Sequence, residues 1–128
     1  MSSVVLDASA VLAVLHGEPG ADVVASALVG TAIISSVNLA EIVGKLADAG
    51  VPRRSMAEIL DPLGIEVAPF DADLAYRAGM LRPLTRGKGL SLGDRACLAL
   101  ALERALPVLT ADAIWHDLAV GVDVRPIR

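Results

Sequence analysis

Residues 4–15, VVLDASAVLAVL, join a short apolar run to a helical pattern through one acid. Residues 4–6 predict a buried strand and residues 8–15 predict a helix, so Asp7 lies at the strand-to-helix junction. Ligands of an open parallel sheet collect at the carboxyl ends of its strands, which makes Asp7 a candidate functional residue. The alternative is that Asp7 only caps the helix, a role that aspartate fills with about 1 kcal/mol of stabilisation.

The alternation of strands and helices continues along the chain. Further strands are predicted at 31–34, 65–68, 107–110 and 122–127. Further helices are predicted at 21–29, 37–49, 52–63, 72–84 and 91–105, with a helical turn at 113–118. Strands that alternate with helices indicate an α/β fold, with a mainly parallel sheet of about five strands that helices cover on both sides.

Length and composition limit the kind of protein. The chain has 128 residues, of which 55% are hydrophobic and 20% are charged, and this suits one domain over residues 1–128. A segment that spans a bilayer needs about 20 apolar residues, and no apolar run here is that long, so we expect no membrane association. No basic segment precedes Asp7, so we expect no export signal. The lone Cys97 is consistent with a reducing, cytoplasmic location. The net charge of −4 argues against binding nucleic acid through overall charge.

Three further acids stand out by their positions. Asp112 repeats the position of Asp7, because it follows the predicted strand at 107–110, and helix capping is again the alternative. Glu41 and Asp94 lie instead in otherwise apolar helical segments. Burying an ionised carboxylate without a partner costs several kcal/mol, so such residues require an ion pair, a metal ion or a cleft.

Both helical acids also have an ordinary explanation. Asp94 can pair with adjacent Arg95, or lie in the first turn of a helix that Ser91 caps. Glu41 can lie on a solvated helix face with Lys45 four residues later. Spacing alone leaves these alternatives open.

Four segments carry these acids: VVLDASA at 4–10, SVNLAE at 36–41, LSLGDRACLA at 90–99 and LTAD at 109–112, with GVDVR at 121–125 closing the pattern. In this order they resemble the PIN-domain ribonucleases, and specifically the VapC toxins of bacterial toxin–antitoxin pairs. The resemblance covers essentially the whole chain. It implies a three-layer α/β/α sandwich, an acidic cleft that binds Mg²⁺ or Mn²⁺, and hydrolysis of RNA phosphodiester bonds. It also implies a homodimer and a VapB-type antitoxin whose tail lies over the cleft.

Carried across by position, the resemblance assigns catalysis and metal binding to Asp7, Glu41, Asp94 and Asp112. Mg²⁺ prefers hard oxygen ligands, keeps several waters and is held by only one or two direct carboxylates. We therefore expect Asp7 and Asp94 to lie nearest the metal ion, with Glu41 and Asp112 holding waters or a second ion. Clustered carboxylates without a metal ion repel each other, so at least one should have a raised pKa.

Three polar residues in the same segments are expected to support the acids: Ser9, Asn38 and Thr110. The hydroxyls of Ser9 and Thr110 can donate hydrogen bonds to the metal-binding carboxylates. For each hydroxyl, helix capping or a hydrogen bond to the backbone is the alternative.

Basic residues gather just before the Asp94 segment. Residues 74–93 contain four basic residues and no acid. We expect Arg82, Arg86 and Lys88 in this segment to contact RNA phosphates, and the alternative is an ordinary solvated loop.

Two functions of different classes remain. The first is a metal-dependent endoribonuclease toxin, with Mg²⁺ or Mn²⁺ as cofactor and RNA as substrate. The second is a non-catalytic α/β module, either a receiver-like signalling domain or a degenerate PIN scaffold that acts through partner binding. A receiver-like domain would have a lysine near its last strand, and residues 107–127 contain none. The formal charge of −4 equals that of the four proposed site acids, so the rest of the chain is neutral.

Overall fold

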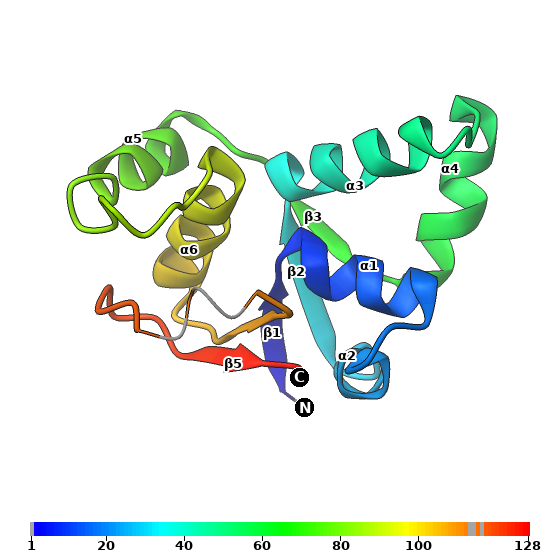
Figure 1. Ribbon diagram of the computed structural model, residues 1–128, viewed down its shortest axis with the longest axis horizontal. Coiled ribbons are helices and arrows are strands. Elements are labelled where there is room, and N and C mark those ends of the chain that lie inside the picture. The colour runs from blue at the N-terminus through cyan, green and yellow to red at the C-terminus, as the bar shows by residue number, and fades with distance from the viewer. Residues whose placement is uncertain (1, 113–114, 116) are drawn as a thin grey trace.

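The computed structural model describes residues 2–112, 115 and 117–128, and a parallel β-sheet lies at its centre (Figure 1). Within these residues the strands are β1 (Ser3–Leu6), β2 (Thr31–Ser35), β3 (Glu66–Ala68), β4 (Val108–Thr110) and β5 (Val124–Pro126). Their order in the sheet is β3-β2-β1-β4-β5, and every neighbouring pair is parallel. The expected α/β fold with a parallel sheet of five strands is confirmed.

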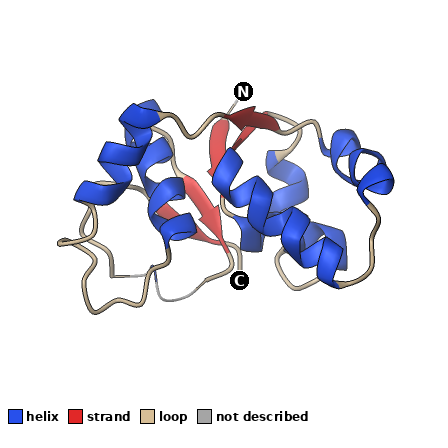
Figure 2. Ribbon diagram, turned by 90° about the horizontal axis from the view of Figure 1, so that it is seen from above, coloured by secondary structure: helices blue, strands red, loops and turns tan. Residues whose placement is uncertain are grey.

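Helices cover both faces of this sheet. One side carries α1 (Ala8–His16), α2 (Ala21–Ala27), α3 (Ser36–Asp48), α4 (Arg53–Leu60) and the short 3₁₀ helix η1 (Asp61–Leu63). The other side carries α5 (Ala72–Met80) and α6 (Leu92–Arg104). Seen from above, the strands lie between the two groups of helices (Figure 2). The architecture is therefore the expected three-layer α/β/α sandwich.

Alternating side chains of β1 supply both halves of the core. Val4 and Leu6 pack with the buried residues of α1 to α4, whereas Val5 packs with those of α5 and α6. Successive side chains of a strand point to opposite faces, and a strand that is covered on both faces is apolar throughout. The uninterrupted apolar run at 4–6 is thus explained by its central place in the sheet.

Among the described residues, two helices end three or more residues earlier than predicted, and each of these ends lies near a proline. The helix expected over 52–63 continues as an α-helix only to Leu60, because Pro62 lacks an N–H and its ring clashes with the carbonyl four residues earlier. The helix expected to reach residue 84 ends at Met80, shortly before Pro83, which disfavours helical backbone at the residue before it.

Two other expectations concern the helical segments. The helical turn predicted at 113–118 includes residues 113, 114 and 116, which lie outside the described residues, so it stays a prediction. None of the helices described is long and apolar enough to cross a membrane.

The order of the strands places a switch point between β1 and β4. After β1 the chain forms β2, which pairs with one edge of β1. The other edge of β1 pairs with β4. In open α/β sheets the carboxyl ends of the strands at such a point form the ligand crevice. The order also differs from the 2-1-3-4-5 order of receiver-like folds. The sheet therefore excludes the receiver-like alternative and directs attention to the residues that follow β1 and β4.

Candidate active site

Asp7 follows β1 and is the N-cap of α1, with its side chain only 4% exposed. Its Oδ1 accepts the Ala10 N–H at 2.9 Å, and Ser9 Oγ donates to Oδ1 and Oδ2 at 2.7 and 2.9 Å. Thr110 Oγ1 donates to Oδ2 at 2.6 Å. Burial nevertheless raises the pKa of Asp7 to about 6, and the charge of Asp94 adds to the increase. Asp7 does cap α1, but capping alone does not require such burial.

The hydroxyls of Ser9 and Thr110 join the ends of β1 and β4. While donating to Asp7, Ser9 Oγ also accepts the Ala111 N–H at 2.9 Å, and Thr110 Oγ1 accepts the Asp112 N–H at 3.0 Å. Each hydroxyl therefore makes both kinds of hydrogen bond that the sequence left open. As a result, the Asp7 carboxylate and the backbone of Asp112 are held in one network.

Asp94 lies in the first turn of α6 and is half-buried. It forms a capping box with Ser91, in which Oδ2 accepts the Ser91 N–H at 2.9 Å and Ser91 Oγ accepts the Asp94 N–H at 3.2 Å. Among the described residues, no ion pair within 4.0 Å joins Asp94 to Arg95. Burial raises the pKa of Asp94, and repulsion from Asp112 adds to this. The alternative that Asp94 lies in the first turn of a helix capped by Ser91 is therefore correct for its Oδ2. Its Oδ1 makes no hydrogen bond within the described part of the chain.

Glu41 reaches α6 from α3. The buried Asn38 side chain donates through Nδ2 to Glu41 Oε1 at 2.8 Å and to the Gly93 carbonyl at 3.0 Å, so it links the two helices. A Cβ added at Gly93 would overlap the Glu41 carboxylate. Gly93 was missed by the sequence reasoning, although a glycine inside a predicted helix signals close packing. The alternative explanation, a Glu41–Lys45 ion pair, is not formed within 4.0 Å in the described residues.

These residues line one cleft of about 180 Å³, which we name the acid cleft. It is lined by Asp7, Ala8, Ser9, Leu12, Asn38, Glu41, Lys45, Asp94 and Asp112. The structure thus brings the four sequence-predicted acids together, from the ends of β1 and β4 and from α3 and α6. Lys45, which the sequence considered only as a partner of Glu41, also lies in this cleft.

The chemistry of the cleft suits a hard divalent cation. In the described residues, no three His, Cys, Asp or Glu side chains are arranged closely enough to hold a metal ion together. Mg²⁺ does not need such a cage, because one or two carboxylates and several waters complete its coordination. Burial is the main cause of the raised pKa values of Asp7 and Asp94, the charge of a nearby acid adds to each, and a bound cation would stabilise both ionised carboxylates. The buried Asn38 Oδ1 has no hydrogen-bond partner among these residues and could accept a bond from a metal-bound water.

The predicted RNA-contacting residues lie partly together. Arg82 and Arg86 line a pocket of about 560 Å³ beside the first turn of α6, together with Arg95, and we name it the arginine pocket. Lys88 belongs to the same loop but is not one of the lining residues. The sequence reasoning treated Arg95 only as a partner for Asp94, because the curvature of the loop that encloses Arg95 is not visible in a residue pattern.

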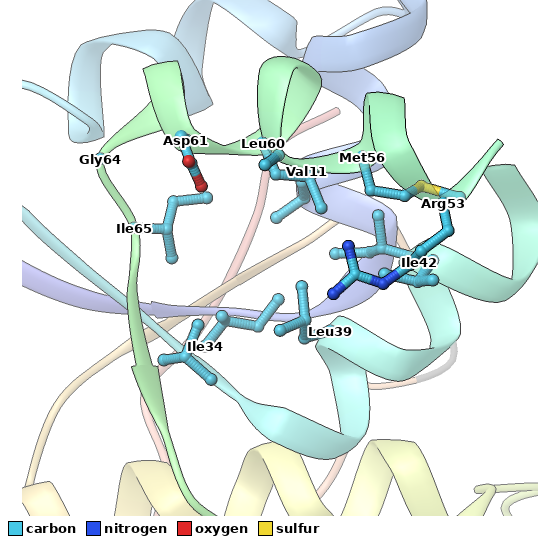
Figure 3. Close-up of a pocket in the computed structure, with 13 residues that line it drawn as sticks. Val11, Ile34, Leu39, Ile42, Arg53, Met56, Leu60, Asp61, Gly64 and Ile65 are labelled. Carbon is cyan, nitrogen blue, oxygen red and sulfur yellow. The ribbon is translucent and has the colours of Figure 1, made fainter. Parts of the chain in front are cut away.

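A further pocket, of about 420 Å³, is apolar and lies between α3 and α4 (Figure 3). Leu39 and Ile42 of α3 line it, whereas Asn38 and Glu41 of the same helix line the acid cleft. The helical period explains this division into two faces. Among the described residues, Asp61 is the only acid that lines the apolar pocket, so the smaller cleft with its convergent carboxylates is the candidate active site.

Comparison with known proteins identifies the family of the chain. The model of the PIN domain family matches residues 4–121. The chain is 33% identical to ribonuclease VapC42 of Mycobacterium tuberculosis over an alignment of 132 positions, which covers 95% of this chain and 97% of that protein. The chain belongs to the VapC family of PIN-domain proteins. The VapC ribonuclease Mb2780c of Mycobacterium bovis shows the same identity and coverage.

Solved structures share the fold of this VapC-family chain. DNA-bound VapBC from Salmonella typhimurium superposes with a TM-score of 0.77 and 20% identity, covering 100% of both chains. VapBC-5 from Mycobacterium tuberculosis superposes with a TM-score of 0.61 and 29% identity, covering 100% of this chain and 99% of that one. The first similarity concerns the fold alone. The resemblance inferred from four short segments is thus confirmed at the level of the family.

Proposed function

We propose that this chain is the toxin of a toxin–antitoxin pair and hydrolyses RNA phosphodiester bonds as an endoribonuclease at the acid cleft. The observation that carries the proposal is the convergence of Asp7, Glu41, Asp94 and Asp112 in one cleft at the switch point of the sheet. The family relatives named as ribonucleases support it. A non-catalytic scaffold would not need to keep four carboxylates together against their mutual repulsion.

The side chains of the acid cleft would have different roles. Asp7 and Asp94 would hold Mg²⁺ or Mn²⁺ directly, and Glu41 and Asp112 would hold its waters. When bound, the ion polarises the phosphate and lowers the pKa of an attacking water. Ser9 and Thr110 orient the Asp7 carboxylate by donating hydrogen bonds to it.

The partners follow from the family and from the surface. We infer a VapB-type antitoxin, because the solved structures that share this fold include toxin–antitoxin complexes. We infer a homodimer through α5, because Tyr76 and Met80 lie one turn apart on it and are 77% and 71% exposed. Leu84, which is 67% exposed, lies four residues after Met80, beyond the end of α5. A cytoplasmic location completes the proposal, since RNA is the substrate.

The experiment is RNA cleavage by the purified chain without its antitoxin, in Mg²⁺, in Mn²⁺ and in EDTA. We expect cleavage with either ion and none in EDTA. Asp7→Asn and Asp94→Asn should lose cleavage while circular dichroism shows an intact fold. Arg54→Gln, an exposed change on α4, is the control and should cleave normally. Full activity in both aspartate variants would disprove the mechanism.

A further inference from the structure

The arginine pocket has three arginines and no acid among the described residues that line it. Its lining residues are Arg82, Thr85, Arg86, Gly87, Gly89, Leu90, Ser91, Leu92 and Arg95, which include no carboxylate. Within the described residues, no Asp or Glu oxygen lies within 4.0 Å of the guanidinium groups of Arg82, Arg86 or Arg95. Arg77 on α5 differs, since its Nε pairs with Asp73 Oδ2 at 2.9 Å.

Arg95 has a buried donor that lacks an acceptor. Its Nε is buried and makes no hydrogen bond among the described residues. Leaving a buried donor unpaired costs about 1–3 kcal/mol, and more for a charged group. An anion in the pocket would lie among three arginine side chains, and an anion that reached the Nε–H would remove this cost. Planar guanidinium donors match the oxygens of a phosphate group.

The loop before α6 is held in a shape that forms this pocket. Thr85 is buried and donates through its N–H and its Oγ1 to the Leu81 carbonyl at 3.0 and 2.9 Å. The Lys88 N–H then donates to the Thr85 carbonyl at 3.1 Å. Gly87 and Gly89 have φ values of +83° and +72°, which favour glycine. The curved loop therefore brings Arg82 and Arg86 to the first turn of α6.

That first turn joins the arginine pocket to the acid cleft. Asp94 lines the cleft and its neighbour Arg95 lines the pocket, because consecutive residues point about 100° apart around a helix. The charge of Arg95 also lowers the pKa of Asp94, so the two sites are close enough to interact electrostatically. An extended polyanion could thus occupy both sites at once.

We propose that the arginine pocket binds a backbone phosphate of the RNA strand, next to the phosphate held in the acid cleft. This assignment rests on the proposed function, and it identifies a part of the surface that binds the RNA substrate. It adds Arg95 to Arg82 and Arg86, and the RNA contact expected of Lys88 stays a prediction outside this pocket. Inorganic phosphate has the same chemistry as a backbone phosphate, so the test must separate the two.

The test measures binding in EDTA, where metal-dependent cleavage does not occur. Fluorescence anisotropy with a labelled single-stranded RNA gives the dissociation constant over a range of KCl concentrations. Each lost phosphate contact should lower the slope of log affinity against log salt by about 0.7. We expect Arg86→Gln and Arg95→Gln each to lower the slope in this way and to weaken RNA binding about tenfold at low salt. Arg54→Gln, which removes the same charge from α4, is the matched control.

A second variant separates the pocket from general electrostatics. Arg95→Lys keeps the charge and removes the buried Nε–H donor, so it should weaken RNA binding nearly as much as Arg95→Gln. Thermal unfolding checks that both variants fold. The proposal is overturned if the pocket variants behave like Arg54→Gln, if Arg95→Lys binds like the wild type, or if inorganic phosphate at millimolar concentration displaces RNA completely.

The outcome also distinguishes this proposal from the proposed function. If arginine-dependent RNA binding occurs but no divalent ion supports cleavage, the endoribonuclease fails and the phosphate pocket stands. If the chain cleaves RNA while the pocket variants bind RNA like the control, the pocket fails and the endoribonuclease stands.

Discussion

Thr110 Oγ1 donates a 2.6 Å hydrogen bond to Asp7 Oδ2 and so joins the carboxyl ends of β4 and β1. This bond stabilises the ionised form of Asp7 against the effect of burial. Thr110→Val keeps the shape but removes the bond, and the pKa of Asp7 should rise further. Residues that orient a metal ligand typically change metal affinity or activity 10–100-fold. We expect RNA cleavage to fall by about tenfold and the Mn²⁺ concentration for half-maximal activity to rise. Thr31→Val, on the exposed start of β2, should change neither quantity.

The pKa of Asp7 predicts how stability depends on pH when no metal is bound. Burial raises it from 3.8 to about 6 in the folded chain. The contribution of Asp7 is therefore fully present below pH 3.8 and is lost as the pH rises through 6. The free energy of unfolding should fall over this range by up to about 3 kcal/mol from this residue. Asp94 acts in the same direction because its pKa is also raised.

Urea unfolding in EDTA at several pH values measures this dependence. Asp7→Asn should flatten most of it and should make the metal-free chain more stable than the wild type at neutral pH. If the free energy of unfolding depends on pH equally in Asp7→Asn and in the wild type, Asp7 is not the group that causes the dependence.

Gly93 predicts an unusual response to alanine. Alanine has the higher helix propensity, by about 1 kcal/mol relative to glycine in a helix interior, and Gly93 lies in the first turn of α6. At Gly93, however, the added Cβ overlaps the Glu41 carboxylate. We expect Gly93→Ala to displace Glu41 and to lower the rate of RNA cleavage, with little or no gain in stability. Gly44→Ala on α3 has open space around its Cβ and should raise thermal stability with activity unchanged. If Gly93→Ala and Gly44→Ala change stability and cleavage rate equally, the tight contact between α3 and α6 is contradicted.

The exposed apolar face of α5 predicts the site of self-association. Leu74 and Ala78 are buried, whereas Tyr76 and Met80 are exposed on the same helix. If a second copy covers this face, Tyr76→Glu combined with Met80→Glu should convert a dimer to a monomer in light scattering. Val29→Glu, a substitution at an exposed valine beyond α2, should not. A double variant that stays dimeric would place the interface elsewhere.

Much of the site could be predicted because it depends on local sequence. Asp7 and Asp112 each follow an apolar run that becomes a central strand, and the carboxyl ends of such strands are where ligands bind. The identity of the neighbouring strands could not be predicted in the same way. Strand pairing is non-local, so the switch point between β1 and β4 emerges only from the complete sheet.

The remaining features depend on contacts between helices and on loop shape. Glu41 meets Gly93 only because α3 and α6 approach each other, and no periodicity in either helix contains that information. Arg95 joins Arg82 and Arg86 because the loop before α6 curves back. The early ends of α4 and α5 are different, since Pro62 and Pro83 are local signals whose effect on the helix was underestimated.

The central claim is that the acid cleft holds a divalent metal ion between Asp7 and Asp94. Anomalous diffraction from crystals of the wild-type chain soaked in Mn²⁺ tests it most directly. We predict an anomalous peak in the acid cleft, roughly 2.1 Å from oxygens of Asp7 and Asp94, with waters bridging it to Glu41 or Asp112. The absence of a peak in the cleft at saturating Mn²⁺, or a peak only at another place on the molecule, would contradict the claim.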